Sequence, residues 1–166
     1  MKKSLIRISL FSAVFILASF APASKIKYTS AEGKLEITFP TAFDIQDMST
    51  ENYSSIQAKA DLDDQLFFMT YNIHTTELSD HEGLAETSLS SFTEALHGEI
   101  TSRNTWQVKK NKGLKAKLKI EEYDLVGDYG VVIVGQIQYQ VAVVSATDKW
   151  NQARSDAFFK SFKIKN

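Results

Sequence analysis

The side chains with the broadest chemical range in this sequence are those of its three histidines, because a neutral imidazole can bind a metal ion or accept a proton near neutral pH. They are His74, His81 and His97. His81 and His97 fall on one expected helix, where their separation corresponds to about 24 Å at 1.5 Å per residue, so they cannot share a metal. His74 and His81 could form a two-histidine site with Asp80 or Glu82. No fixed ligand spacing supports such a site, and surface histidines in a loop and at helix ends are the favoured interpretation.

A cluster of aspartates at Asp61, Asp63 and Asp64 suggests calcium, because hard cations bind grouped carboxylates. An EF-hand loop that began at Asp61 would need a glycine and a glutamate where the sequence has Leu66 and Asn72. Aspartate is also a frequent turn residue. We therefore predict a polar hairpin turn rather than a metal site, and we predict no cofactor.

Further carboxylates lie close together in the chain, at Glu121, Glu122, Asp124 and Asp128. Acid–base catalysis needs two carboxylates held across a cleft, which neighbours along one strand and its turn do not provide, so we expect these groups to be solvated. The sequence also lacks Gly-x-Ser-x-Gly, Gly-x-Gly and cysteine, and so offers no nucleophile elbow, glycine-rich phosphate loop or thiol. The residues do not favour an enzyme, and a hydrolase is the third functional hypothesis.

The most distinctive charged feature is a run of lysines at Lys109, Lys110, Lys112, Lys115, Lys117 and Lys119. The last three alternate with apolar residues, at Leu114, Ala116, Leu118 and Ile120. On a strand this alternation places the ammonium groups on one face. Such a stripe could bind an anionic partner: a lipid headgroup surface, a polysaccharide or an acidic protein. A solvated strand face that discourages edge aggregation is the alternative. Trp106 is the only nearby aromatic ring, so nucleic acid is not favoured.

The first residues are typical of an export signal. Lys2, Lys3 and Arg7 precede the uncharged residues 8–21, and alanines follow at Ala21 and Ala23. The apolar run is too short to span a bilayer, which needs about 20 residues, so we predict cleavage and no stable transmembrane anchor. Loss of residues 1–23 takes the formal net charge from −1 to −4. We expect export to the periplasm or the medium, and a single domain over residues 24–166.

Alternating apolar residues and turn residues predict two hairpins in the first half of that domain. The first pairs residues 25–29 with 34–39, and the second pairs 56–60 with 66–73, while residues 41–54 are expected to be irregular. A Ser-x-x-Glu capping box at residues 79–82 predicts an amphipathic helix that Gly98 closes.

Strands return from residue 100 to residue 144, with turns expected at 111–113, 127–130 and 135–136. Thr147 or Asp148 then caps a second helix, in which Trp150, Ala153, Ala157 and Phe158 share one face, and residues 162–164 extend beyond it. Short turns favour antiparallel pairing of neighbouring strands. Each of the two helices has one apolar face, which it must bury against the sheet. The fold class is therefore α+β, with a mostly antiparallel sheet covered by helices.

Two segments resemble the PsbP/Mog1-like superfamily. The first combines Tyr28-Thr29-Ser30 with residues 33–40, and the second is residues 157–164. The resemblance implies an α/β/α sandwich around an antiparallel sheet. It also implies an accessory or binding role, since known members are a photosystem subunit and a regulator of a small GTPase. No functional motif of either can be matched to residues of this chain.

The leading functional hypothesis is an exported, non-enzymatic accessory or binding domain that acts through its surface. Its partner would be another protein or an anionic envelope surface, not nucleic acid. The alternative is a carrier of a small apolar ligand held between sheet and helix. That alternative rests on apolar groups on both faces of one strand, at Phe67, Phe68, Met69 and Tyr71.

Overall fold

Ten strands and two α-helices make up residues 24–165, the part of the chain that the computed structural model describes. The signal peptide expected at residues 1–23 lies outside the described residues. The strands are β1 (Ile26–Ser30), β2 (Leu35–Phe39), β3 (Phe43–Asp47), β4 (Tyr53–Leu62), β5 (Gln65–His74), β6 (Glu99–Val108), β7 (Asn111–Ile120), β8 (Leu125–Val134), β9 (Ile137–Ala146) and β10 (Lys163–Ile164). The helices are α1 (His81–Ala95) and α2 (Gln152–Ser161), with short 3-10 turns η1 (Glu121–Tyr123) and η2 (Thr147–Lys149).

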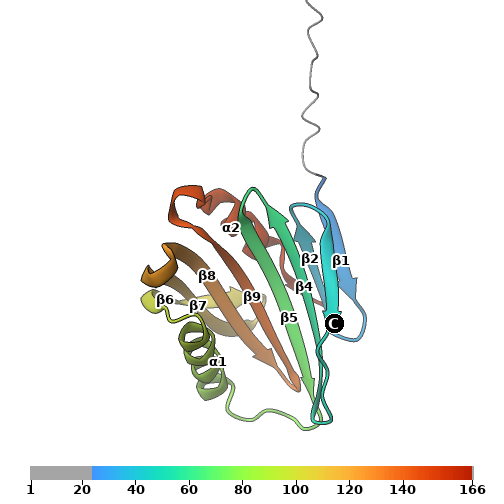
Figure 1. The fold of residues 1–166 in the computed structure, drawn as a ribbon. Helices are drawn as coiled ribbons and strands as arrows, with labels where there is room; N and C mark the ends of the chain where they lie inside the picture. The colour runs from blue at the N-terminus through green and yellow to red at the C-terminus, as the bar shows by residue number, and fades with distance from the viewer. Residues whose placement is uncertain (1–23, 166) are drawn as a thin grey trace, which may run out of the picture.

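The strands form two antiparallel sheets that stack with the helices in layers. The seven-stranded sheet has the order β3-β4-β5-β9-β8-β7-β6, and the three-stranded sheet has the order β1-β2-β10. On one face of the large sheet α1 packs over β7 and β8, and on the other α2 packs against β2 of the small sheet. Figure 1 shows α1 over one side of the large sheet and β4 and β5 bare on the same face. The α+β prediction is confirmed.

The larger core lies between the large sheet and the layer of α2 and β2. Leu35, Ile37 and Phe39 alternate along β2 and are all 0% exposed, as their period of two predicts. The Phe158 ring of α2 contacts the Phe39 and Phe67 rings at centroid distances of 5.0 Å and 5.3 Å. This aromatic packing fixes α2 on the sheet and so determines what remains of the surface around it.

Both ends of α1 differ from the predicted capping. The N-cap is Asp80, whose Oδ1 accepts a hydrogen bond from the Gly83 N–H at 2.9 Å. At the other end His97, not Gly98, has the left-handed backbone, with φ of 52°. The Gly98 N–H donates to the Thr93 carbonyl at 2.9 Å, which closes a Schellman motif around His97.

The second helix begins later than predicted. Asn151 is its N-cap and accepts from the Arg154 N–H at 3.1 Å, whereas Thr147 lies in η2. The buried face also differs from the predicted one, because Ser155, Phe158 and Phe159 are buried and the predicted face residues 153 and 157 are exposed.

Three of the expected loops were also placed wrongly. Residues 41–54 contain β3, and residues 127–130 lie inside β8. The turn before β8 is η1, which Asp124 ends with a left-handed φ of 49°. The β6–β7 turn is at residues 109–110, where Lys109 has φ of 52°, and Gly113 lies within β7.

An acidic group ties the small sheet together and makes part of its stability depend on pH. Glu36 of β2 contacts Lys27 of β1 at 3.2 Å and Lys165 at 2.8 Å. Lys165 and Lys27 lower the pKa of Glu36 from its ordinary 4.5 to about 2. Because the pKa is depressed in the folded state, the stabilisation is present above pH 4.5 and is lost as the pH falls toward about 2.

We therefore expect Glu36→Gln to lower the melting temperature at neutral pH, and we expect its gap from the parent protein to close between pH 4.5 and about 2. Thermal unfolding followed by circular dichroism across that range measures the gap. Glu51→Gln, at an exposed loop position, is the matched control and should leave the melting temperature unchanged. A Glu36→Gln gap that is the same at every pH would contradict the assignment.

Neither helix within residues 24–165 is both long enough and apolar enough to cross a membrane.

Candidate functional site

A wide cleft lies where several chain turns meet at one end of the large sheet. Its walls come from the β1–β2 turn, the segment after β5, the β6–β7 and β8–β9 turns, and the chain end after β10. Antiparallel pairing places these turns at the same end, because β5, β8 and β6 all finish there and β9 and β7 begin there. The cleft has a volume of about 1010 Å³.

Four lysines from three separate segments line this cleft: Lys34, Lys109, Lys110 and Lys165. All four are exposed. Lys34 and Lys109 have left-handed backbones, with φ of 48° and 52°, at positions where glycine or asparagine is the ordinary choice. The Gln107 side chain stabilises the β6–β7 turn at Lys109 by donating hydrogen bonds to the carbonyl oxygens of Lys109 and Asn111 at 2.6 Å and 3.2 Å.

The cationic groups of the cleft are not all equally available. Lys165 is bound to Glu36 at 2.8 Å. Lys34, Lys109 and Lys110 make no ion pair with any residue of the described range 24–165. Two exposed carboxylates, at residues 32 and 77, also line the cleft, so its positive character is concentrated at the β6–β7 turn and Lys34.

The floor of the cleft is apolar. It is formed by Ile73, Val134, Ile137, Tyr139 and Ile164. Burial raises the pKa of Tyr139 to about 12, so its hydroxyl stays neutral at physiological pH. Lysines around an apolar floor can bind a group that combines negative charge with apolar surface.

The predicted lysine run divides between two environments. Lys109 and Lys110 reach the cleft, and Lys112 is exposed on β7 close to the same turn. Lys115, Lys117 and Lys119 do share one face of β7, since Ala116 and Leu118 between them are buried on the other. Their ammonium groups contact carboxylates of the protein itself, and Lys119 is bound to Glu121 at 2.7 Å.

Asp128 is the carboxylate that occupies the other two lysines of the stripe. It lies opposite Lys117 in the β7–β8 ladder and is 0% exposed. The Nζ atoms of Lys117 and Lys115 lie 3.3 Å and 3.7 Å from its oxygens. Ser155 Oγ and Gln152 Nε2 of α2 donate to it at 2.6 Å and 3.1 Å. The expectation that Asp128 is solvated was wrong, because these four groups replace water around the carboxylate.

Trp106 is part of the core rather than an exposed aromatic surface. It is 9% exposed, and its ring contacts Phe159 and Phe162 at centroid distances of 5.4 Å and 5.3 Å. Lys115 lies over the Phe159 ring at 4.1 Å, which places this cation above the same aromatic group.

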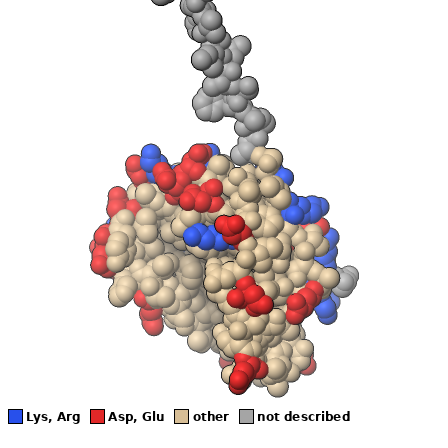
Figure 2. Space-filling model, turned by 45° about the vertical axis from the view of Figure 1, so that its right-hand side comes forward, with Lys and Arg blue, Asp and Glu red and all other residues tan. Residues whose placement is uncertain are grey.

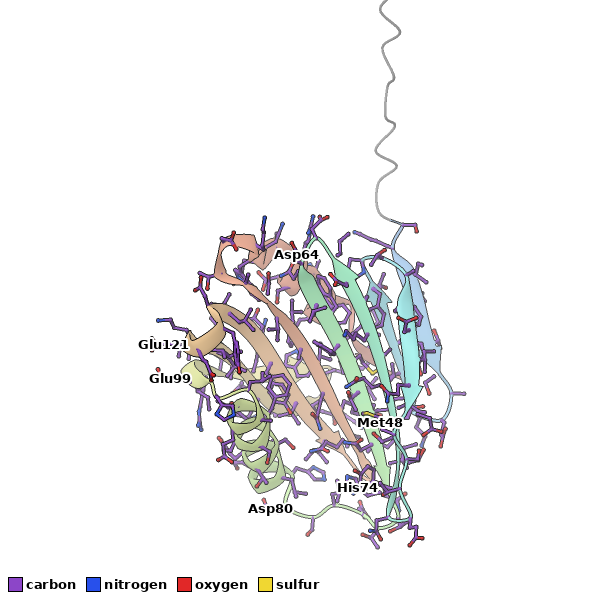
Figure 3. All side chains as sticks on the ribbon, viewed as in Figure 1. Met48, Asp64, His74, Asp80, Glu99 and Glu121 are labelled. Carbon is purple, nitrogen blue, oxygen red and sulfur yellow. The ribbon has the colours of Figure 1, made fainter. Side chains whose placement is uncertain are left out.

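The histidines lie at separate places. His74 ends β5, and His81 and His97 are exposed at the two ends of α1. Figure 3 shows His74 apart from Asp80 at the start of α1. His74 Nε2 is buried without a hydrogen-bond partner among the described residues, and its ring lies 5.8 Å from that of Tyr53. No group of three or more possible metal ligands occurs within residues 24–165.

The aspartate cluster forms the β4–β5 turn. Asp63 and Asp64 both have left-handed backbones, with φ of 52° and 63°. This is the backbone that a two-residue hairpin turn requires. Asp63 binds Arg154 of α2 at 2.7 Å, and Figure 3 shows Asp64 at the end of β5 opposite His74. The prediction of a polar hairpin turn is confirmed.

A second, apolar groove lies between α1 and the bare part of the large sheet. Apolar side chains that line it are Leu66, Phe68, Phe92, Leu96, Leu125, Ala142 and Val144. The groove is partly open and has a volume of about 300 Å³. Figure 2 shows a mostly uncharged face, with acidic residues grouped most densely at the upper left and others spread over its centre and lower part, and with Lys and Arg mainly along the right margin.

Sequence reasoning missed Lys34 and Lys165 in the cleft and Asp128 beneath the lysine stripe. The two lysines come from opposite ends of the chain, and only the pairing of β2 with β10 brings them together. The position of Asp128 could have been predicted from the alternation of side chains along its strand. It lies one residue before Tyr129, so in an extended strand the two side chains lie on opposite faces of the sheet.

No family model matches the sequence, and comparison with curated proteins gives no match. Solved structures do share the fold. The solution structure of cyanobacterial PsbP (CyanoP) from Synechocystis sp. PCC 6803 is similar with a TM-score of 0.63 at 11% identity, over 88% of this chain and 95% of that one. A crystal structure from Bacteroides thetaiotaomicron VPI-5482 is similar with a TM-score of 0.50 at 9% identity, over 84% of this chain and 48% of that one. The chain therefore has the PsbP-like fold, as the two resembling segments predicted.

Proposed function

We propose that the protein is an exported, non-enzymatic accessory or binding domain and that its lysine-rimmed cleft receives an acidic segment of a partner protein. The observation that carries this proposal is the position of Lys34, Lys109 and Lys110. Their ammonium groups surround an apolar floor and have no ion-pair partner within residues 24–165. The order of charged, apolar and small residues in residues 1–23 supports the export part of the proposal.

The concave shape of the cleft favours a protruding protein segment over a flat envelope surface. A planar layer of anionic headgroups would contact the rim lysines but would not reach the half-buried floor residues Ile73 and Val134. A segment that alternates acidic and apolar side chains can contact both. Rim charges would mainly set its rate of association, and the apolar contacts its lifetime.

The test is a titration with a short synthetic peptide in which aspartate alternates with leucine, followed by fluorescence anisotropy. We expect saturable binding that weakens with salt, and we expect the double variant Lys109→Glu, Lys110→Glu to weaken it by about tenfold or more. A peptide with serine in place of aspartate measures the contribution of charge.

The matched control is the double variant Lys25→Glu, Lys149→Glu, which makes the same change in net charge at exposed positions outside the cleft. It should bind the acidic peptide as the parent protein does. Equal weakening in both double variants would show a general charge effect and would overturn the cleft as the site. Binding to phosphatidylglycerol vesicles without binding to the peptide would replace the protein partner with a lipid surface.

A second function, the carriage of a small apolar ligand, is favoured by the groove beside α1. Of the four β5 residues that suggested it, Phe67, Met69 and Tyr71 are buried in the main core, at 0%, 0% and 2% exposed. Phe68 alone points to the opposite face, where it lines the groove. The ligand would therefore lie beside α1 in a space that the core side chains leave free.

A further inference from the structure

The last strand of the large sheet has an edge to which no segment of the described chain is paired. β6 pairs with β7 on one side, and no backbone hydrogen bond joins residues 102–108 to any other element within residues 24–165. Figure 1 shows β6 at the end of the sheet away from β3. Asn104 and Thr105 point to opposite faces of the strand and are both exposed, so no other layer covers the middle of this edge.

This edge lacks most of the features that keep exposed strands from pairing. Protected edges are short, or they carry lysine, proline or a bulge. β6 has ten residues, whereas β3 at the other edge of the sheet has five. The bulge of β6 lies between Ile100 and Ser102, and residues 102–108 contain neither lysine nor proline. The one charged side chain among them, Arg103, is paired with Glu86 of α1 at 2.7 Å. This length of edge is therefore open to a further strand.

The turn between β6 and β7 determines which backbone groups point outward. Val108 and Asn111 flank a two-residue turn, so they are the first and last residues of a β-turn and form the closing hydrogen-bonded pair of the hairpin. Hydrogen-bonded and non-hydrogen-bonded pairs alternate along an antiparallel ladder. Every second residue back from Val108 therefore bonds to β7, and the N–H and C=O groups of Arg103, Thr105 and Gln107 point away from it.

A hollow beside the end of β6 adjoins the lysine-rimmed cleft. It has a volume of about 270 Å³, and its apolar lining comes from the rings of Trp106, Phe159 and Phe162. Lys109 lines both the cleft and the hollow, so the two meet at the β6–β7 turn. Lys160 of α2 also lines the hollow, is exposed and makes no ion pair within residues 24–165. Cations without ion pairs thus lie beside apolar surface here, as they do in the cleft.

We propose that the acidic segment received by the cleft extends beyond it and pairs, as an added strand, with the free edge of β6. The inference rests on the proposed function and adds the conformation and length of the partner segment. The outward backbone groups of β6 would supply affinity, and alternate side chains of the added strand would meet the hollow. Lys109 and Lys160 favour an acidic partner over a second copy of this strand, because residues 102–108 contain no carboxylate to pair with them.

The test compares two aspartate–leucine peptides by fluorescence anisotropy. The short peptide is the one that the cleft is expected to bind. The long peptide has about eight further residues at each end, which at about 3.3 Å per residue lets either end cover residues 102–108. We expect the long peptide to bind about tenfold or more tightly than the short one.

Two N-methylated forms of the long peptide separate strand pairing from added charge. One carries the methyl groups on the leucine nitrogens of the extensions, and the other carries them on the aspartate nitrogens. Successive N–H groups of a strand point to opposite edges, so only one of the two forms loses the donors that face β6. That form should bind as weakly as the short peptide, and the other should bind like the unmethylated long peptide.

A pair of variants at one position tests the same contact from the protein side. Thr105→Pro removes an outward N–H from the middle of the edge without removing a bond to β7, and Thr105→Ala retains it. We expect Thr105→Pro to lose the additional affinity for the long peptide and Thr105→Ala to keep it. Both variants should bind the short peptide as the parent protein does, and circular dichroism checks that the proline variant is folded.

The outcomes separate this inference from the proposed function. If neither peptide binds, both fail. If the short peptide binds but the long one gains nothing, or if the two methylated forms bind equally, the cleft stands and the added strand is wrong. Equal binding of the long peptide by folded Thr105→Pro and Thr105→Ala would also overturn it. Binding of the long peptide alone, with the expected difference between its methylated forms, would support the added strand and overturn the cleft.

Discussion

Replacing Asp128 with alanine should destabilise the protein by about 3 kcal/mol, because removing one member of a buried ion-pair network leaves the others without compensation. Asp128 is 0% exposed and accepts from Ser155 Oγ at 2.6 Å and from Gln152 Nε2 at 3.1 Å. Without it the Ser155 hydroxyl, which is also 0% exposed, loses its acceptor, and Lys117 loses a charge partner at 3.3 Å. The network connects α2 to the sheet, so the loss should loosen the packing of α2.

Urea unfolding followed by tryptophan fluorescence measures the change, since Trp106 and Trp150 both lie on the α2 side of the sheet. Asp156→Ala is the matched control. Asp156 contacts Lys115 at 3.7 Å in the same network, but its side chain is 60% exposed, so its removal should cost less than about 1 kcal/mol. Equal losses in the free energy of unfolding for the two variants would contradict the role of Asp128 as the buried acceptor that connects α2 to the sheet.

Replacing Gly113 with alanine should destabilise the protein by about 2–3 kcal/mol through overpacking. A Cβ atom at this position of β7 would lie 2.1 Å from the Val131 carbonyl oxygen and 2.8 Å from the Val132 Cβ. The first of these atoms belongs to the backbone of β8 and cannot rotate away. The two strands would therefore have to separate, which weakens the ladder that begins at Leu114 and Val131.

Gly135→Ala is the comparison that separates crowding from backbone strain. Gly135 has φ of 60° in the β8–β9 turn, and nothing lies within 4 Å of the position of an added Cβ. Its replacement should cost only about 1 kcal/mol, the usual effect of a side chain in the left-handed region. Unfolding in urea gives both values. A Gly113→Ala variant no less stable than Gly135→Ala would show that β7 and β8 are not as closely packed as described.

The sequence predicted most of the strands because their patterns are local. Leu35, Ile37 and Phe39 alternate with polar residues, and one buried face is the direct consequence. The lysines of β7 were likewise placed on one face correctly. Interactions within a few residues were enough for both predictions.

The errors arise where distant residues decide the local structure. Residues 127–130 have the composition of a turn, yet they are extended, because Lys117 and Ser155 stabilise a buried Asp128 that would otherwise need water. Gly130 is needed within the strand, since a Cβ there would lie 2.6 Å from the Phe159 ring. None of these partners is near in sequence.

The candidate site was only half predictable for the same reason. Lys109 and Lys110 were identified from their own run of lysines. Lys34 and the residues of the floor come from turns and strands that meet only after two sheets have formed. The sequence could not show that Lys109 and Lys110 are free of ion pairs within the described residues while Lys115 and Lys117 are paired, because that difference depends on the position of Asp128.

The cleft is tested most directly by mapping the acidic peptide on the protein with NMR. Backbone amide shifts of the isotope-labelled protein would be followed during a titration with the aspartate–leucine peptide. The account predicts that the largest changes occur at the turns around Lys34, Lys109, Lys110 and Gln136 and at Lys165 after β10. The largest changes along the stripe of Lys115, Lys117 and Lys119, or changes too small to map at saturating peptide, would contradict it.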